Sequence, residues 1–349
     1  MFFLGGKDNL LTNKGTITAL NGLAVYVFDG PLTFTDWSCD MNGCEKVFST
    51  INLPAASLNA ANLEGGKILG DIVLGSAADR VTNSGEITGN LALGGGAARG
   101  FAHIGVIKAL EAQGIVPDII VGTSAGAVVG ALYSSGLSGF ELQKIALEID
   151  EGQVSDWSLP DRGVFKGEAL QNFVNRAVGN RPLEKLPRSF SVVATDLKSG
   201  ESALFRSGNT GMAVRASSAV PGVFQPVNIN GRDYVDGGLV SPIPVRAARS
   251  LGANFVIAVD ISVNPRDART ASTFDVLLQT FAIMGRSISR YETTEADIVI
   301  RPVTAELPAT DFAGRHRAVL EGEKATAAMM AEIKDRLARL RNPPPAMAR

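Results

Sequence analysis

A serine stands between two glycines in residues 122–126 (GTSAG), directly after a run of β-branched residues and directly before a run of small ones. A strand that turns at once into a helix at a G-x-S-x-G sequence is the setting of a nucleophile elbow, which exposes the serine hydroxyl on a sharp turn. The N-terminus of the following helix favours negative charge that develops near Ser124. We therefore predict that Ser124 is a nucleophile.

A second glycine-rich segment, residues 94–100 (GGGAARG), also lies between a predicted strand and a predicted helix. Such a loop points several backbone N–H groups in one direction, so it can hold a phosphate or an oxyanion. Dinucleotide binding fits poorly, because a G-x-G-x-x-G spacing counted from Gly94 reaches Arg99 where glycine or alanine is required. Because the loop precedes a serine elbow, an oxyanion hole is the better interpretation.

The nucleophile needs a base, and the chain contains only two histidines, His103 and His316. The first lies in the helix after the glycine loop and the second heads a C-terminal amphipathic helix, so we interpret both as structural or surface residues. A carboxylate is the alternative base. Asp236 ends a predicted strand and precedes two glycines, Gly237 and Gly238. That is a position at which α/β folds display catalytic groups.

The elements that must position these residues alternate between strand and helix from residue 91 onward. The patterns predict strands at residues 91–93, 116–121, 190–195, 203–205, 254–261 and 297–301. They predict helices at residues 101–113, 125–134, 139–150, 167–178, 243–251 and 316–341. Such alternation favours a mostly parallel sheet with helices on both faces.

The first 88 residues have a different texture, rich in Asn, Gly and Thr. Residues 12–18 (TNKGTIT) recur as residues 82–88 (TNSGEIT), and Asn-x-Gly turns between short alternating strands are typical of β-structure. Residues 66–75 resemble coils of the β-solenoid passenger regions of bacterial autotransporters. A solenoid normally needs at least three stacked repeats. A loose β-rich extension therefore remains an equal alternative.

The motifs taken together, in this order, resemble the patatin-like phospholipase family. The resemblance covers residues 91–262 and rests on residues 94–100, 122–126, 163–167, 213–227 and 236–238. It implies a three-layer α/β/α fold with a mostly parallel central sheet. It also implies a Ser–Asp dyad without a catalytic histidine, with Ser124 as the nucleophile and Asp236 as its base.

The resemblance further implies an oxyanion hole built by the glycine loop, with the backbone N–H of Ala125 as a contributor. The loop residues concerned are Gly94, Gly95, Gly96 and Ala97, and the supporting motif residues are Arg99, Gly100, Gly122, Gly126, Gly237 and Gly238. Ala97 stands where many members carry a further glycine, which argues against a positive φ at that position. Arg99 either orients the loop or a phosphate headgroup, or forms a salt bridge at the helix start.

We therefore expect a lipid acyl hydrolase of the phospholipase A or esterase type that works through an acyl-enzyme, without cofactor or metal. The alternative is a β-solenoid adhesin or passenger fragment joined to a catalytically inert hydrolase-like domain. The expected segments are a β-rich extension or partial β-solenoid over residues 1–88; a hydrolase domain over residues 89–335, with its core at 91–262; and a helix end and tail over residues 336–349.

Composition bounds the partners and the compartment. The 349 residues carry a formal net charge of −2 and no basic block, which argues against a nucleic-acid partner. A lipid or acyl-ester substrate suggests contact with a membrane surface, although the apolar residues that could form a lip fit a buried core slightly better: Phe140, Val154, Trp157, Leu159 and Phe165. We see no signal peptide or transmembrane segment, which favours a cytoplasmic or peripheral-membrane protein. Cys39 and Cys44 are either free thiols or one local disulfide.

Overall fold

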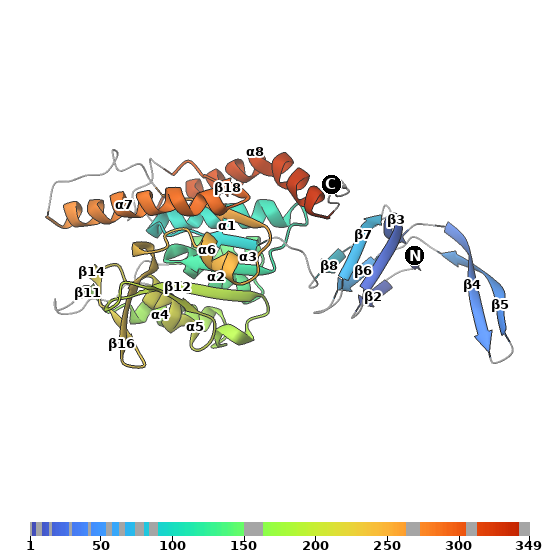
Figure 1. Cartoon of the computed structure of the whole chain (residues 1–349), viewed down its shortest axis with the longest axis horizontal. Coiled ribbons are helices and arrows are strands. Elements are labelled where there is room, and N and C mark those ends of the chain that lie inside the picture. The colour runs from blue at the N-terminus through green and yellow to red at the C-terminus, as the bar shows by residue number, and fades with distance from the viewer. Residues whose placement is uncertain are drawn as a thin grey trace, which may run out of the picture. The chain divides into compact units, whose positions relative to one another are not determined.

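The computed structural model describes residues 90–149, 163–262, 273–304 and 313–341 and, before them, the strands β1–β8 without their side chains. The chain divides into two compact units, Met1–Ile87 and Thr88–Arg349. Figure 1 shows the elements of both units.

The first unit consists of strands. They are β1 (Phe2–Leu4), β2 (Asn9–Asn13), β3 (Thr16–Val27), β4 (Gly30–Asp40), β5 (Gly43–Leu53), β6 (Leu58–Asn62), β7 (Lys67–Val73) and β8 (Arg80–Asn83). β1, β3 and β7 form one parallel sheet, and β2, β6 and β8 form another, so the chain passes three times through both. The register aligns Asn13 with Asn62 and Asn62 with Asn83, which places a third, diverged copy between the two repeats that the sequence displays.

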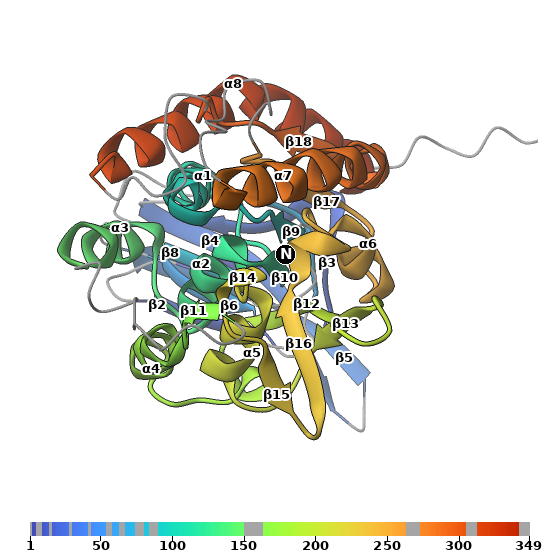
Figure 2. The same ribbon diagram turned by 90° about the vertical axis from the view of Figure 1, so that its left-hand side faces the viewer.

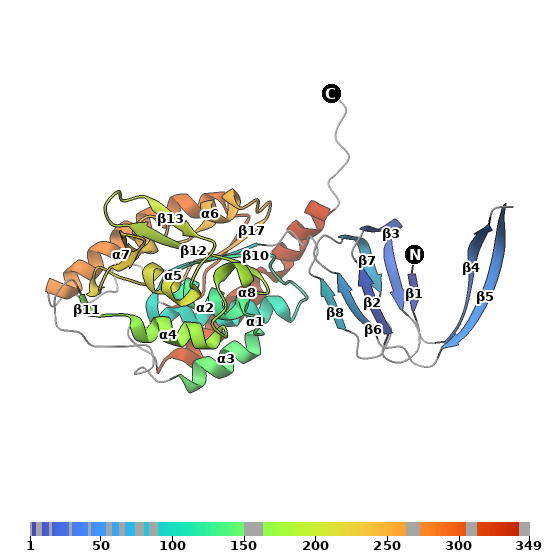
Figure 3. The same ribbon diagram turned by 90° about the horizontal axis from the view of Figure 1, so that it is seen from below.

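A hairpin of β4 and β5 interrupts the second of these passes (Figure 3). Its antiparallel register sets Cys39 directly opposite Cys44. The side chains of both cysteines lie outside the described residues.

The second unit is built on an eight-stranded mixed sheet in the order β15-β16-β12-β10-β9-β17-β18, with β13 paired to β12. The strands are β9 (Asn90–Leu93), β10 (Ile119–Thr123), β12 (Ser189–Asp196), β13 (Ser202–Phe205), β15 (Val227–Ile229), β16 (Arg232–Asp236), β17 (Val256–Val259) and β18 (Ile298–Ile300). The run from β12 to β18 is parallel, whereas β13, β15 and β16 pair antiparallel at one side. Two further strands, β11 (Gly163–Phe165) and β14 (Gly222–Phe224), pair with each other.

Consecutive residues of the central strands enter two different cores. Leu91 and Ile120 belong to the core shared with most of the helices, whereas their neighbours Ala92 and Val121 face the core that contains α6. Helices therefore cover both faces (Figure 2), as continuous apolar strands require. This confirms the predicted α/β fold with a mixed, mostly parallel sheet.

The helices of this unit agree closely with the sequence patterns, with two exceptions. They are α1 (Phe101–Glu111), α2 (Ala125–Ser134), α3 (Gly139–Glu148), α4 (Glu168–Ala177), α5 (Thr210–Ser217), α6 (Val245–Ser250), α7 (Thr273–Glu292) and α8 (Arg315–Arg341). Short 3₁₀ turns lie at η1 (Ala97–Gly100), η3 (Leu183–Lys185), η4 (Gly237–Leu239) and η6 (Thr293–Glu295). Helices α5 and α7 are the two that the sequence patterns did not predict.

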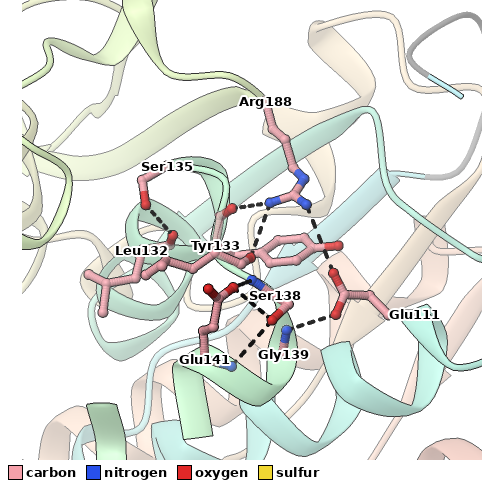
Figure 4. Close-up of polar contacts among 9 residues, drawn as sticks. Glu111, Leu132, Tyr133, Ser135, Ser138, Gly139, Glu141 and Arg188 are labelled. Carbon is pink, nitrogen blue, oxygen red and sulfur yellow. Dashed lines mark hydrogen bonds and ion pairs between the residues drawn. The ribbon is translucent and has the colours of Figure 1, made fainter. Parts of the chain in front are cut away.

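Polar contacts fix the helix ends around the start of β12 (Figure 4). Arg188 donates hydrogen bonds to the carbonyls of Tyr133 and Leu137, and its guanidinium lies 4.2 Å from the centre of the buried Tyr133 ring. Glu111, at the end of α1, accepts a 2.7 Å hydrogen bond from the N–H of Gly139. Ser138 and Glu141 complete a capping box on α3. These contacts hold α1, α2, α3 and β12 together at the end of α2 opposite Ser124.

Candidate active site

Ser124 occupies a sharp turn between β10 and α2. Its φ of +52° and ψ of −119° lie outside the regions that residues with a side chain ordinarily adopt. A Cβ on Gly122 would lie 2.5 Å from the carbonyl oxygen of Gly126, and one on Gly126 would collide with the carbonyl of Leu93 in β9. The flanking glycines are needed because backbone passes against backbone here. This is the geometry of a nucleophile elbow.

The backbone N–H of Ser124 is held by a second serine, which lies within the motif of residues 213–227 but to which the sequence assigned no role. Ser217, the last residue of α5, accepts that N–H at 2.8 Å and donates its own hydroxyl to the carbonyl of Val193 at 2.5 Å. The strained turn is therefore tied to β12 through one buried hydroxyl.

Asp236 ends β16, opposite Ala194 of β12, while the adjacent Val193 pairs with Thr123 of β10. The carboxylate thus reaches the same edge of the sheet as Ser124. Its Oδ1 accepts the N–H of Gly238 at 2.7 Å, and its backbone carbonyl accepts the Thr195 hydroxyl at 2.8 Å.

Burial raises the pKa of Asp236 from 3.8 to about 6, against opposing contributions from the Gly238 N–H and the Ser124 hydroxyl. The Ser124 hydroxyl lowers the pKa of Asp236 as a nearby donor does, and Oδ2 of Asp236 has no hydrogen-bond partner among the described residues. A carboxylate with a raised pKa is a stronger base than an exposed one.

The glycine after this carboxylate is required by packing. A Cβ on Gly237 would strike the carbonyl of Val193 and lie 3.1 Å from Cγ2 of Thr123. The hydroxyl of that threonine donates at 2.8 Å to the carbonyl of Ser241. The hydroxyl of Ser241 in turn donates at 2.5 Å to Glu292, the last residue of α7. Burial raises the pKa of Glu292 to about 7. A continuous set of hydrogen bonds thus joins the elbow strand to α7.

The glycine loop lies directly beside Ser124, since a Cβ on Gly95 would come within 3.2 Å of the Ser124 Cβ. Two of the predicted oxyanion donors are already engaged. The N–H of Gly94 donates to Val259 O at 3.1 Å, and the N–H of Gly95 donates to Pro242 O at 3.0 Å. In this arrangement these two amides fasten the loop and are not available to an oxyanion.

The amides of the loop that remain without an acceptor, among the described residues, include those of Gly96 and Ala97. The N–H of Ala125, in the first turn of α2, is likewise without one. Ala97 has a φ of +51°. The expectation that its methyl group argues against a positive φ is therefore wrong: the loop adopts the left-handed conformation despite the side chain.

Neither histidine is placed to act as the base. His103 is fully buried and its Nε2–H donates to the carbonyl of Gly94 at 2.7 Å, while burial lowers its pKa to about 4. It therefore fastens the glycine loop as a neutral ring. His316 lies exposed on α8.

Arg99 lies near the end of the glycine loop, with its Nε buried and without a hydrogen-bond partner among the described residues. Burial lowers its pKa to about 10. No ion pair with a described carboxylate involves Arg99, so the predicted helix-start salt bridge is not formed there.

Two of the apolar residues considered as a lip lie in the described part of the chain. Phe140 on α3 is 71% exposed and has the ammonium of Lys108 4.9 Å from its ring centre. Phe165 of β11 packs against Phe224 of β14, with ring centres 5.5 Å apart. The other three lie in residues 154–159, outside the described residues. In the described part of the chain, no helix is long and apolar enough to cross a membrane, and no three His, Cys, Asp or Glu side chains are grouped to hold a metal ion.

The chain is similar in sequence to proteins of a known family. Residues 91–249 match the family described as patatin-like phospholipase. An uncharacterized NTE family protein of Mycobacterium bovis is 39% identical over 188 residues, which are 53% of this chain and 52% of that protein. The mouse patatin-like phospholipase domain-containing protein 6 is 33% identical over 232 residues, 63% of this chain and 17% of that protein.

The chain spans about half the length of the mycobacterial relatives and a smaller share of the mammalian ones. Among solved structures, VipD from Legionella pneumophila superposes with a TM-score of 0.48 at 14% identity, covering 85% of this chain and 70% of that one.

Proposed function

We propose that this chain, whose residues 91–249 match the patatin-like phospholipase family, is a serine acyl hydrolase of lipids, with Ser124 as the nucleophile and Asp236 as its base. The observation that carries this proposal is the buried carboxylate beside the strained serine, with a pKa raised to about 6. A carboxylate of that basicity accepts a hydroxyl proton far better than one with an ordinary pKa near 4.

The reaction would begin when Asp236 takes the proton of Ser124 and Oγ attacks the acyl carbonyl of the lipid. The N–H groups of Gly96, Ala97 and Ala125 support this proposal as oxyanion donors, because no hydrogen bond within the described chain occupies them. Loss of one such donor typically costs about 2.7–4 kcal/mol of transition-state stabilisation. The amides of Gly94 and Gly95 no longer belong to the proposed set.

Collapse of the tetrahedral intermediate breaks the ester C–O bond, and the protonated Asp236 returns its proton to the leaving alcohol. Water then attacks the acyl-enzyme while Asp236 accepts its proton, and on collapse the ester bond to Ser124 Oγ breaks and Asp236 gives that proton to Oγ, which releases the free acid and restores both side chains. His103 takes no part, because its ring is buried, neutral and bonded to Gly94.

The substrate class follows from the family and not from a cavity in the structure. Patatin-like membership implies a lipid acyl ester, and phospholipid hydrolysis is the finer form of the proposal. Arg99 supports it as a cation with a buried, unpaired Nε directly after the glycine loop. A panel of phospholipids and neutral acylglycerols distinguishes the two classes of lipid.

The test is hydrolysis of a short-chain nitrophenyl ester together with covalent labelling by a fluorophosphonate. Ser124→Ala should lose both, with kcat/KM falling by at least about a thousandfold. Ser135→Ala is the matched control, because that serine lies at the other end of α2 and donates only to the local carbonyl of Leu132. Full activity of Ser124→Ala would refute the proposal. Absence of labelling in the unaltered protein would favour the catalytically inert alternative.

A further inference from the structure

Helix α7 turns apolar side chains outward. The large hydrophobic residues exposed in the described part of the chain number ten, and five of them are on this one helix. Their exposed fractions range from 40% to 72%. They are Val276, Leu277, Ile283, Met284 and Tyr291, here called the α7 face.

The α7 face is a single stripe. Positions 276, 280, 283, 284, 287 and 291 recur at helical spacing and are all exposed; four of them are apolar, and the polar Thr280 and Ser287 lie among them. The opposite side carries the buried residues Ser289 and Glu292. A surface helix ordinarily presents polar and charged residues to solvent. Helix α8 does so, with Lys324, Lys334 and Asp335 among its exposed residues.

This helix also lies beside the turn that follows Asp236. On its inner side a Cβ on Gly285 would lie 3.7 Å from the carbonyl oxygen of Gly238, two residues after Asp236. At its end, Glu292 accepts the hydroxyl of Ser241 and the N–H of Ile243. Toward its start, Cδ2 of Leu277 lies 3.3 Å from where a Cβ on Gly222 would be, beside the Phe165–Phe224 pair. Helix α7 therefore packs against the turn that follows Asp236, and Leu277 of its exposed face reaches β14.

The exposed charge among the described side chains of α7 is positive. Among its described side chains the charged ones are Arg286, Arg290 and Glu292. Arg290 is exposed at the edge of the α7 face, whereas Glu292 is 3% exposed and bonded inside the fold. An apolar stripe edged by cations is the pattern of helices that lie in the interface of a lipid bilayer.

We propose that the α7 face docks the protein on the surface of a phospholipid bilayer, with its apolar side chains in the interface and Arg290 among anionic headgroups. The inference rests on the proposed function in one respect, that the site beside α7 receives an acyl lipid. A protein partner on this face would stand at the rim of the site and obstruct a lipid, whereas a bilayer presents the substrate there.

The binding experiment uses the full chain with Ser124→Ala, so that the lipid is not consumed. Co-sedimentation is measured with vesicles of phosphatidylcholine, with and without phosphatidylglycerol. The double variant Ile283→Gln, Met284→Gln should bind at least about tenfold more weakly to both, because it removes apolar surface from the interface. The matched control is Leu320→Gln, Leu340→Gln on α8, whose leucines are also exposed and which should bind unchanged.

A single variant tests the charge. Arg290→Gln should weaken binding to the phosphatidylglycerol vesicles by about fivefold, which is about 1 kcal/mol for one cation near an anionic surface. Binding to pure phosphatidylcholine should stay the same.

Thermal unfolding of each variant and light scattering of the protein in solution complete the test. Absence of vesicle binding by the parent protein, or equal binding by the α7 variant and its control, overturns the inference. So does an α7 variant that only converts a dimer into a monomer, because the face is then an interface between copies. Since binding is measured without turnover, it can succeed where ester hydrolysis fails, and the two proposals fail separately.

Discussion

At the scale of single residues, the strained backbone conformations of the site and the close backbone–backbone contacts occur at different positions. Ser124 and Ala97 carry the left-handed φ values, +52° and +51°. The motif glycines Gly122, Gly126 and Gly237 have no such φ, but a Cβ on any of them would meet backbone atoms. The glycine of the motifs therefore provides room for backbone to approach, while the conformational strain of about 1–3 kcal/mol per residue is carried by residues with side chains.

Replacing Ala97 by glycine should relieve part of that strain. A left-handed conformation costs an L-residue about 1–2 kcal/mol, which glycine does not pay. The greater backbone freedom of glycine in the unfolded chain opposes this gain by about 0.5–1 kcal/mol. We expect Ala97→Gly to raise the free energy of unfolding by up to about 1 kcal/mol in urea titrations. Gly114→Ala is the control of opposite sign, because Gly114 has a φ of +70° with open space around it. A loss of stability in Ala97→Gly would contradict this account.

The pH dependence of hydrolysis should report Asp236. The base must be ionised, and burial raises its pKa to about 6, so kcat/KM should fall below that pH with a single proton. Glu292 also titrates near neutrality, with its pKa raised by burial to about 7. Glu292→Gln separates the two groups, since the acid limb near pH 6 should persist in that variant. A limb that moves or vanishes in Glu292→Gln would assign the titration to Glu292 instead.

The same raised pKa should make Asp236 a burden on stability. A group with its folded pKa above its unfolded value stabilises the fold below the unfolded pKa and loses that contribution as the pH rises through the folded one. The rise from 3.8 to about 6 corresponds to about 3 kcal/mol. Asp236→Asn keeps an acceptor for the Gly238 N–H, so it should be inactive yet more stable by up to that amount at about pH 8. In equilibrium unfolding the advantage should disappear below about pH 4; an advantage independent of pH would contradict the assignment.

Local sequence patterns located the site residues whose motif includes its own strand and turn. They missed the residues that act through contacts with distant parts of the chain. The serine elbow and the acid at a strand end are visible locally, because each motif carries its own strand and turn. Ser217 holds Ser124 across 93 positions, and Glu292 holds Ser241 across 51. No spacing rule connects such pairs. The hydrogen bonds that occupy the Gly94 and Gly95 amides come from equally remote carbonyls, at Val259 and Pro242.

At the scale of elements, α7 shows why a long helix escaped prediction. Amphipathic helices are recognised by apolar residues on one face and polar residues on the other. In α7 the outward face is itself apolar, from Val276 to Tyr291, while Glu292 and Ser289 lie inside. The usual periodicity is thereby blurred. The exposed apolar residues of α7 made the helix hard to predict from the sequence, and the same residues form the proposed docking surface.

Helices α1 and α8 cross in close contact, and each contributes one glycine to the crossing, Gly105 on α1 and Gly322 on α8. A Cβ on Gly105 would strike the carbonyl of Val319, and one on Gly322 would strike the carbonyl of Ala102. Gly105→Ala should therefore force the helices apart and lower the free energy of unfolding by at least about 2 kcal/mol. Gly285→Ala is the matched control, a helical glycine at ordinary contact distance from its nearest neighbour. Its better helix propensity should stabilise by up to about 1 kcal/mol. Equal unfolding free energies for the two variants would show that the α1–α8 crossing tolerates a methyl group.

At the scale of the whole molecule, the candidate site belongs to one of the two units. Ser124, Asp236 and Ser217 and every hydrogen bond described for them lie within Thr88–Arg349. The first strand of the central sheet begins at Asn90, whose side chain bonds to Phe255 O and to the N–H of Ile119. The strands that support the site are thus fastened to one another without the first unit.

Removal of Met1–Ile87 should therefore leave the proposed chemistry intact. A unit with its own hydrophobic core can fold by itself, and the main core cluster is drawn entirely from residues 91–337. We expect the shortened protein to hydrolyse a soluble nitrophenyl ester with kcat/KM within about twofold of the full chain, and to label equally with a fluorophosphonate. The shortened protein carrying Ser124→Ala is the control for background hydrolysis. A tenfold or larger loss with an unchanged unfolding transition would mean that the first unit contributes to the site. An unchanged rate would show that the β-structure of the first unit is not needed for ester hydrolysis.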